Sequence, residues 1–217
     1  MNKPSKLAGL TVLVTGAASG IGRQMARDLF WQEKCNLLLL DQDAQQLEVL
    51  QDELAPRAPN DSANPERQAL HQPSVHIFSC DIAAPDSVAR FMEQIAEYPV
   101  DILINNAGIF YLGLFERMAL NDFARVIEVN LLGGIRMTKE ILPKLLQSRH
   151  AFIVNIASMA GLKGAPGMCA YATSKFGMVG FSEALAIELQ GRVGICTVCP
   201  TFIKTDIANN TIFSQST

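Results

Sequence analysis

The sequence is poor in charged residues and carries no surplus of positive charge. Asp, Glu, Lys and Arg make up 18% of its 217 residues, and the formal net charge is −3. This composition gives no electrostatic reason to expect nucleic acid as a partner. Apolar residues make up 49% of the chain, which argues against disorder and predicts a single globular domain over residues 1–217.

Long apolar runs, a paired set of cysteines and clustered histidines are also lacking. The opening MNKPSK is not followed by the apolar stretch of a signal peptide, and LLLL at residues 37–40 is too short to cross a bilayer. We therefore expect no membrane span and a cytoplasmic location. The five cysteines argue against a closed disulfide framework, and we expect Cys196 and Cys199 to be buried structural thiols. Three scattered histidines offer no zinc-ligand set, so no metal site is expected.

Short apolar runs alternate along the chain with longer segments of helical period. The runs predict six strands, at residues 10–15, 36–41, 75–80, 100–105, 152–157 and 194–199. The other segments predict five helices, at residues 21–33, 44–54, 86–97, 121–147 and 170–189. Strands without polar alternation are typical of a parallel sheet covered on both sides. The order therefore predicts an α/β fold, a Rossmann-like doubly wound parallel sheet with helices on both faces. The stretch 56–73, rich in proline and polar residues, predicts an exposed loop.

A glycine-rich turn directly follows the first predicted strand. Residues 15–22 read TGAASGIG, and a segment of helical period comes next. In a strand–turn–helix unit, Gly16, Gly20 and Gly22 permit a tight turn, close approach of the backbone to a pyrophosphate, and close packing of helix on strand. The helix N-terminus adds amide hydrogens and positive potential for phosphates. This segment predicts a dinucleotide site.

Asp41 closes the second predicted strand. A carboxylate at this place can accept hydrogen bonds from both hydroxyls of the adenine ribose, and it repels a 2′-phosphate. The neighbouring Gln42, and Ser19 in the turn, supply no positive charge. NAD is therefore predicted in preference to NADP. Asp41 could also be the N-cap of the next helix, and the two roles are compatible.

Tyr171 and Lys175 are four residues apart in a segment of helical period. This spacing puts a phenol and an ammonium on one face of a helix, about one turn apart. Because positive charge favours the phenolate, we expect Lys175 and the nearby helix N-terminus to lower the pKa of Tyr171. The pair is a candidate proton donor and acceptor.

These motifs together resemble the short-chain dehydrogenase/reductase family. Three residues separate Gly16 from Gly20, whereas the extended members of that family, which include sugar epimerases, usually have two. The resemblance extends to CDI at residues 80–82, NNAG at 105–108 and YATSK at 171–175, and it covers roughly residues 7–207. Its catalytic positions match Asn130, Ser158, Tyr171 and Lys175. The positions implied to contact the dinucleotide are Gly16, Ser19, Gly20, Ile21, Gly22, Asp41, Asp81, Ile82, Asn105, Asn106, Ala107, Gly108, Tyr171, Lys175, Ile203 and Thr205.

The resemblance implies hydride transfer between NAD(H) and a secondary alcohol or ketone. Tyr171 is expected to act as general acid in reduction and as general base in oxidation. Ser158 is expected to hydrogen-bond the substrate oxygen, and Asn130 to bend its helix and hold a water that links Lys175 to solvent. Plainer alternatives are a turn serine at Ser158, a satisfied core amide at Asn130 and a purely structural Asn106.

The sequence departs from the family pattern after the sixth predicted strand. Thr201 replaces a usual glycine, so the backbone there cannot enter the left-handed region cheaply. The substrate-covering helical segment and the seventh strand that members usually carry do not appear before Thr217. Three hypotheses follow: an active NAD-dependent dehydrogenase, an NAD-binding regulatory or scaffold protein with impaired catalysis, and an extended-type epimerase, which the glycine spacing disfavours.

The sequence says less about the substrate and the oligomeric state. Five apolar residues could line an apolar substrate pocket or belong to the core or an interface: Phe110, Leu112, Leu162, Ala165 and Met168. In family members the helices that correspond to 121–147 and 170–189 form the usual dimer surface. We therefore expect a homodimer or tetramer that acts on a small, apolar alcohol or ketone.

Overall fold

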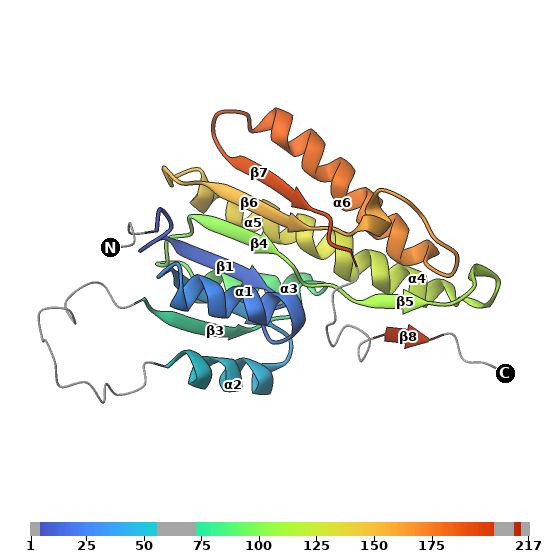
Figure 1. Ribbon diagram of the computed structural model, residues 1–217, viewed down its shortest axis with the longest axis horizontal. Coiled ribbons are helices and arrows are strands. Elements are labelled where there is room, and N and C mark those ends of the chain that lie inside the picture. Colours follow the sequence, from blue (N-terminus) through green and yellow to red (C-terminus); the bar gives the residue numbers. More distant parts are fainter. Residues whose placement is uncertain (1–4, 56–72, 202–210, 214–217) are drawn as a thin grey trace, which may run out of the picture.

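Six parallel strands form the central sheet of the computed structural model (Figure 1), in the order β3-β2-β1-β4-β6-β7. The structure describes residues 5–55, 73–201 and 211–213. The strands are β1 (Thr11–Thr15), β2 (Asn36–Asp41), β3 (Val75–Ser79), β4 (Ile102–Asn105), β6 (Phe152–Ile156) and β7 (Gly194–Val198). The predicted sheet is confirmed, and each predicted strand is matched to within two residues at either end.

The chain order of the strands reverses at the centre of the sheet. From β1 the chain builds outward through β2 to β3, and it then crosses back to place β4 on the other side of β1. In a doubly wound sheet, ligands bind outside the carboxyl ends of the strands at such a reversal. Thr15 at the end of β1 and Asn105 at the end of β4 flank this point.

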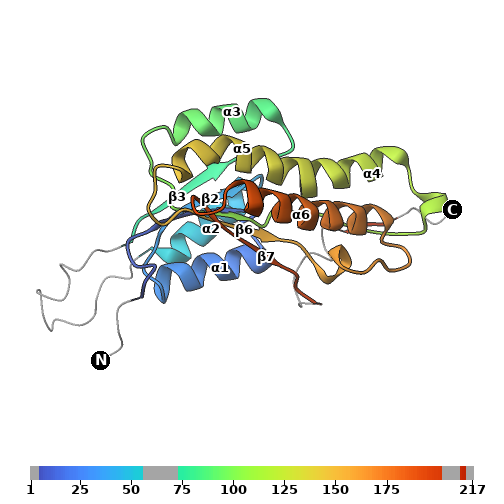
Figure 2. The same ribbon diagram turned by 90° about the horizontal axis from the view of Figure 1, so that it is seen from above.

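Helices cover both faces of the sheet, as Figure 2 shows from above. One face is covered by α1 (Gly20–Trp31) and α2 (Ala44–Leu54), and the other by α3 (Pro85–Gln94), α5 (Gly134–Leu145) and α6 (Cys169–Glu188). Successive residues of a strand point to opposite faces. In β1, Val12 and Val14 therefore pack on the α1–α2 side, whereas Leu13 packs on the α3–α5 side.

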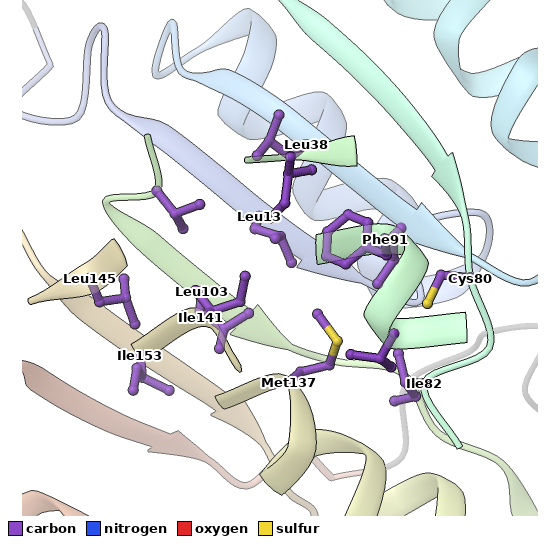
Figure 3. Packing of buried hydrophobic residues seen from close by; sticks show 14 of the residues in the cluster. Leu13, Leu38, Cys80, Ile82, Phe91, Leu103, Met137, Ile141, Leu145 and Ile153 are labelled. Atoms are coloured by element: carbon purple, nitrogen blue, oxygen red, sulfur yellow. The ribbon is translucent and has the colours of Figure 1, made fainter. Parts of the chain in front are cut away.

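The core on the α3–α5 side joins side chains from the sheet to both helices (Figure 3). Leu13 and Leu38 of the sheet belong to one buried cluster with Phe91 of α3 and with Met137 and Ile141 of α5. Each of these five side chains is at most 1% exposed. Burial of a side chain of this size contributes about 1.5–3 kcal/mol, so this layer fixes the position of the helices relative to the strand ends.

The segment 121–147, predicted as one helix, is a succession of three elements. A first helix, α4 (Leu120–Ile127), passes into a π-helical segment, η3 (Glu128–Gly133), and this segment continues as α5. A π-helical turn widens the backbone locally and often accompanies a functional residue. Asn130 lies inside it.

A second, two-stranded parallel sheet was not predicted. It pairs β5 (Phe110–Leu112) with β8 (Thr211–Phe213), which lie side by side in Figure 1. A 3-10 turn, η2 (Phe115–Arg117), follows β5. The predicted loop at 56–73, up to residue 72, and the predicted contacts Ile203 and Thr205 lie outside the described residues.

The prediction that Cys196 and Cys199 are both buried was wrong. Cys196 is exposed and Cys199 is half-buried, because β7 is the last strand in the order of the six-stranded sheet. All five cysteines are free thiols. No helix among the described residues is both long and apolar enough to cross a membrane.

Candidate active site

A cleft of about 850 Å³ runs along the carboxyl ends of the strands. One end is lined by the glycine turn and Asp41, the other by Ser158, Tyr171 and Lys175. The fold thus brings to one cavity two motifs that are more than a hundred residues apart in the chain. A volume of this size is within the range usual for cofactor sites.

The glycine turn packs so tightly that a side chain is excluded at Gly16 and at Gly22. Gly16 has a φ of +66°, and a Cβ on it would lie 2.7 Å from the Cα of Ala107. A Cβ on Gly22 would lie 2.0 Å from the carbonyl oxygen of Gly16. The N-cap of α1, Ser19, makes no capping hydrogen bond from its side chain within the described chain. The first-turn amides of α1 therefore remain free to receive a phosphate, and the residues present fit a dinucleotide.

Asp41 is held at the end of β2 by two backbone amides. Its Oδ2 accepts a 2.9 Å hydrogen bond from the Ala18 amide of the glycine turn, and its Oδ1 accepts one of 3.1 Å from the Asp43 amide. The N-cap of α2 is Asp43, whose side chain accepts from the Gln46 amide. The alternative role of Asp41 as N-cap is therefore not realised, and its carboxylate lines the cleft beside Gln42.

Asp81 and Ile82 line the same part of the cleft after β3. The Ser87 hydroxyl accepts from the Asp81 amide, and Asp81 Oδ1 accepts from the Ala83 amide at 2.9 Å. This local turn fixes the Asp81 side chain. Ile82 is buried and packs against Gly133, where a Cβ would lie 2.8 Å from it.

The two asparagines of the NNAG segment have different surroundings. Asn105 is buried, and its amide nitrogen donates to Thr138 Oγ1 and to Asn155 Oδ1, both at 2.8 Å. Its side chain thus joins β4 to α5 and β6, and Asn105 does not line the cleft among the described residues. Asn106 lines the cleft while its amide nitrogen donates to the carbonyl oxygens of Thr15 and Gly16. Asn106 therefore fixes the glycine turn and faces the cleft as well.

Thr15 is a structural residue of the site that the sequence motif contained but to which no role was assigned. Its hydroxyl accepts hydrogen bonds from the amides of Asn106 and Ala107, at 3.0 and 3.1 Å, and donates to the carbonyl oxygen of Ile104. One hydroxyl therefore joins the ends of β1 and β4 where the strand order reverses. Its place directly before Gly16 was the available signal.

Asn130 projects from the π-helical segment with hydrogen bonds at both Oδ1 and Nδ2. Its Oδ1 accepts from the Ile109 amide at 2.7 Å, and its Nδ2 donates to the Ile109 carbonyl and to Ser174 Oγ. A Cβ on Gly108 would lie 3.2 Å from this Oδ1 and 3.7 Å from Lys175 Nζ. The absence of a side chain at Gly108 therefore leaves room for Asn130 Oδ1 and Lys175 Nζ next to the same short stretch of backbone.

Ser158 and Tyr171 face each other across the substrate end of the cleft. Ser158 caps the 3-10 turn η4 (Met159–Gly161), and its Oγ accepts from the Ala160 amide at 3.1 Å. Burial raises the pKa of the Tyr171 phenol above its ordinary value, and a side-chain hydrogen bond with Ser158 opposes this rise. The expectation that Lys175 lowers the pKa of Tyr171 was therefore wrong for this structure.

Lys175 is 5% exposed and makes one direct hydrogen bond within the described residues, from Nζ to the Ile156 carbonyl oxygen at 2.8 Å. Its Nζ lies 5.7 Å from the centroid of the Tyr171 ring. Burial lowers the pKa of Lys175 to about 8, and the nearby Cys199 opposes this shift. A fraction of the amine is thus neutral near physiological pH.

Two further residues at the substrate end escaped sequence reasoning. Met159 and Lys163, which follow Ser158, line the cleft there with the expected Phe110, Ala165 and Met168. Phe110 makes an edge-to-face contact with Tyr171 at a centroid distance of 4.8 Å. This end of the cleft therefore combines an apolar wall beside Tyr171 with one charged side chain, Lys163.

A doubly wound sheet whose nucleotide turn and Ser–Tyr–Lys group share one cleft defines a nucleotide-dependent oxidoreductase. The family model for short chain dehydrogenases matches residues 10–215. Nodulation protein G of Rhizobium sp. (strain N33) is 38% identical over 203 residues, which cover 92% of this chain and 75% of that protein. The chain belongs to the short-chain dehydrogenase/reductase family.

Solved structures agree with this assignment. A short chain dehydrogenase/reductase from Burkholderia phymatum in complex with NAD superimposes with a TM-score of 0.82 and 30% identity, over 94% of this chain and 70% of that one. A putative NAD(P) dependent gluconate 5-dehydrogenase from Beutenbergia cavernae with bound NADP gives a TM-score of 0.79 and 30% identity, over 94% and 76%. Such relatives support a nucleotide cofactor and leave the choice between NAD and NADP to the residues of this chain.

Proposed function

We propose that this chain, as a single Rossmann-type domain, transfers a hydride between NAD(H) and a secondary alcohol or ketone. The observation that carries the proposal is the meeting of Ser158, Tyr171 and Lys175 in the cleft that also holds the glycine turn and Asp41. Each of these groups has an independent chemical use there, and the family assignment gives the reaction type.

The bound nicotinamide would supply the hydride or accept it. Tyr171 donates its phenolic proton to the substrate oxygen in reduction and takes it back in oxidation. Ser158 donates a hydrogen bond to the same oxygen and stabilises the charge that develops on it. Lys175, whose Nζ lies 5.7 Å from the centroid of the Tyr171 ring, would hydrogen-bond the nicotinamide ribose.

Asn130 has a positioning role in this proposal. Its carboxamide ties the Ile109 backbone to Ser174, one residue before Lys175. A water between Asn130 and Lys175 would connect the amine to solvent, so that the proton lost by Tyr171 is replaced. The π-helical backbone around Asn130 supports such a role, since regular helix would place the side chain differently.

NAD is proposed in preference to NADP because of Asp41. Its carboxylate is fixed by the Ala18 and Asp43 amides at the ribose end of the cleft, beside the uncharged Gln42. A 2′-phosphate at that end would meet like charge at short range, whereas ribose hydroxyls can donate to the carboxylate. In this proposal Gly16, Ser19, Gly20 and Ile21, which line the cleft, surround the pyrophosphate, and Gly22 supports them by its close packing against Gly16.

The substrate is proposed to be a small, largely apolar alcohol or ketone. Phe110, Met159, Ala165 and Met168 surround the space next to Tyr171 and Ser158. Apolar walls favour an apolar substrate body by burial of its surface and leave the hydroxyl or carbonyl as the group that is hydrogen-bonded.

The test is a panel of secondary alcohols with NAD, and of ketones with NADH, in which the absorbance of the reduced nicotinamide is followed. We expect turnover with apolar members of the panel and weaker turnover when NADP(H) replaces NAD(H). NADH binding without turnover on every alcohol and ketone would instead support the second candidate, a regulatory or scaffold protein. That candidate is favoured by one observation, the raised pKa of Tyr171, which leaves little phenolate to act as the base in oxidation at neutral pH.

We also propose assembly into a homodimer or tetramer in a cytoplasmic location. Leu132 of η3 and Phe176 of α6, on the two helical segments implied to form the dimer surface, are 41% and 46% exposed. Burial of such apolar side chains favours association. Five free thiols suit a reducing compartment. Light scattering of the purified chain would measure its oligomeric state.

A further inference from the structure

A network of hydrogen bonds links the residues at the ribose end of the cleft. It includes Arg23, which belongs to none of the sequence motifs. Asp41 accepts from the Ala18 and Asp43 amides, and Asp43 accepts from the Gln46 amide at 3.0 Å. Arg23 of α1 joins this network, because its Nη1 donates to Gln46 Oε1 at 3.1 Å and to the Ala18 carbonyl oxygen at 3.4 Å. The Arg23 guanidinium is therefore linked to the Asp41 carboxylate, which would face the ribose, through one intervening residue, Ala18.

Arg23 nevertheless does not line the cleft, and its guanidinium is bound to Glu53 of α2. Glu53 Oε1 accepts from Arg23 Nη2 at 2.7 Å, and Oε2 accepts from Arg27 Nη2 at 2.6 Å. Hydrogen bonds from Arg27 and Arg23 lower the pKa of Glu53, which keeps it ionised. The Arg23 side chain is 18% exposed, and the residue does not line the cleft.

We propose that Glu53 is a selectivity residue for the dinucleotide. It neutralises the charge of Arg23 and Arg27 and binds both side chains. Without Glu53, the two arginines would attract a 2′-phosphate to the ribose end. The charges of Asp41, Glu53, Arg23 and Arg27 sum to zero in the native chain, and loss of Glu53 leaves a net charge of +1. Arg23 also has an unused donor for a new acceptor, because its Nε is buried without a partner among the described residues. The inference rests on the proposed function, since it presupposes that Asp41 faces the ribose.

The experiment is direct titration of the purified full-length chain with NADH and with NADPH, followed by nucleotide fluorescence. Glu53→Gln keeps the size of the side chain and removes its charge. We expect it to lower the ratio of the NADPH Kd to the NADH Kd about fivefold, the effect typical of one partly exposed charge pair. The matched control is Glu48→Gln, which removes the same charge from an exposed residue of α2 that makes no hydrogen bond among the described residues. This control should leave the ratio within twofold of native.

A second variant tests the inference in the opposite direction and does not depend on the folding of the first. Arg23→Gln leaves Glu53 with Arg27 alone and should raise the ratio. An unchanged ratio in both variants, or the same shift in Glu48→Gln as in Glu53→Gln, overturns the inference while NADH binding still supports the proposed function. Failure of the native chain to bind either dinucleotide overturns the proposed function and this inference with it.

Discussion

The Lys175 amine lies over the face of the Tyr171 ring, 5.7 Å from the ring centroid. The two residues are one helical turn apart on α6, which places the amine next to the ring as a cation beside a π system. Burial shifts the pKa values of the two groups in opposite directions. It raises the pKa of the phenol and lowers that of the amine to about 8, because a charge is disfavoured on both.

Tyr171→Phe should remove nearly all turnover and leave the binding of NADH within about twofold of native. Phenylalanine keeps the ring that packs against Phe110 and lacks only the hydroxyl group that exchanges the proton. Loss of a positioned acid–base group costs roughly 10²–10⁴-fold in rate. Steady-state kinetics and NADH titration measure the two effects. The control is Tyr98→Phe, where the hydroxyl contacts His76 and does not line the cleft; native turnover in Tyr171→Phe would refute the assignment.

Alcohol oxidation and ketone reduction should respond differently to pH. Oxidation needs the phenolate, and the raised pKa of Tyr171 makes it scarce at neutrality. We expect the oxidation rate to rise by up to about tenfold per pH unit from pH ~7. Reduction needs the phenol and should be nearly constant over this range. Parallel rate profiles in both directions test this difference, and an oxidation rate independent of pH would contradict it.

Lys175→Met should stabilise the fold at pH 7 and abolish activity. The native pKa of about 8 lies below the ordinary 10.5, so the unfolded chain binds more protons between these values. The penalty of burying the amine is therefore complete below about pH 8, and native stability rises with pH through this window. Allowing for the lost hydrogen bond to Ile156, we expect a gain of about 1–2 kcal/mol at pH 7 that shrinks towards pH 10.

Urea unfolding of Lys175→Met at several pH values measures this gain. Lys139→Met on α5 is the control, since Lys139 is exposed and its replacement should have little effect at any pH. A loss of stability in Lys175→Met that is the same at pH 7 and pH 10 would show that the burial of the amine carries no such penalty.

Local sequence signals predicted those elements whose first and last residues are determined by their neighbours in the sequence. The apolar run of β2 and the helix α2, which begins after the side-chain cap of Asp43, were predicted with their observed ends. The glycine turn was also readable, because a φ of +66° and a contact of 2.7 Å leave little choice but glycine at Gly16. Such features depend on a few residues that are neighbours in the sequence, so they can be predicted from the sequence alone.

Features that depend on distant parts of the chain were not readable. The pairing of β5 with β8 joins Phe110 to Thr211, and short strands with no strong pattern do not reveal a partner a hundred residues away. The π-helical turn at Asn130 was hidden by an apolar period that continues through it. Exposure of Cys196 and the pKa of Tyr171 follow from what packs beside them, which a motif does not state.

Gly22→Ala should damage both the fold and the dinucleotide site. A Cβ there would lie 2.0 Å from the Gly16 carbonyl oxygen and 2.6 Å from Asn106 Nδ2, so the glycine turn and the group that fixes it must move. Overpacking of this kind costs about 1–3 kcal/mol, and we expect NADH affinity to fall at least about tenfold because the turn surrounds the pyrophosphate. Urea unfolding and NADH titration measure both losses.

The control for this change is Gly180→Ala on α6, where a Cβ would meet no atom within 4 Å. The same added methyl group should there stabilise the helix by about 1 kcal/mol and leave NADH affinity unchanged, because alanine loses less backbone entropy than glycine. The two variants differ only in where one carbon is placed. Equal effects of the two variants on NADH affinity would show that the dinucleotide site does not depend on the tight packing of the glycine turn. Opposite effects on stability, with a loss of NADH affinity in Gly22→Ala alone, would establish that it does.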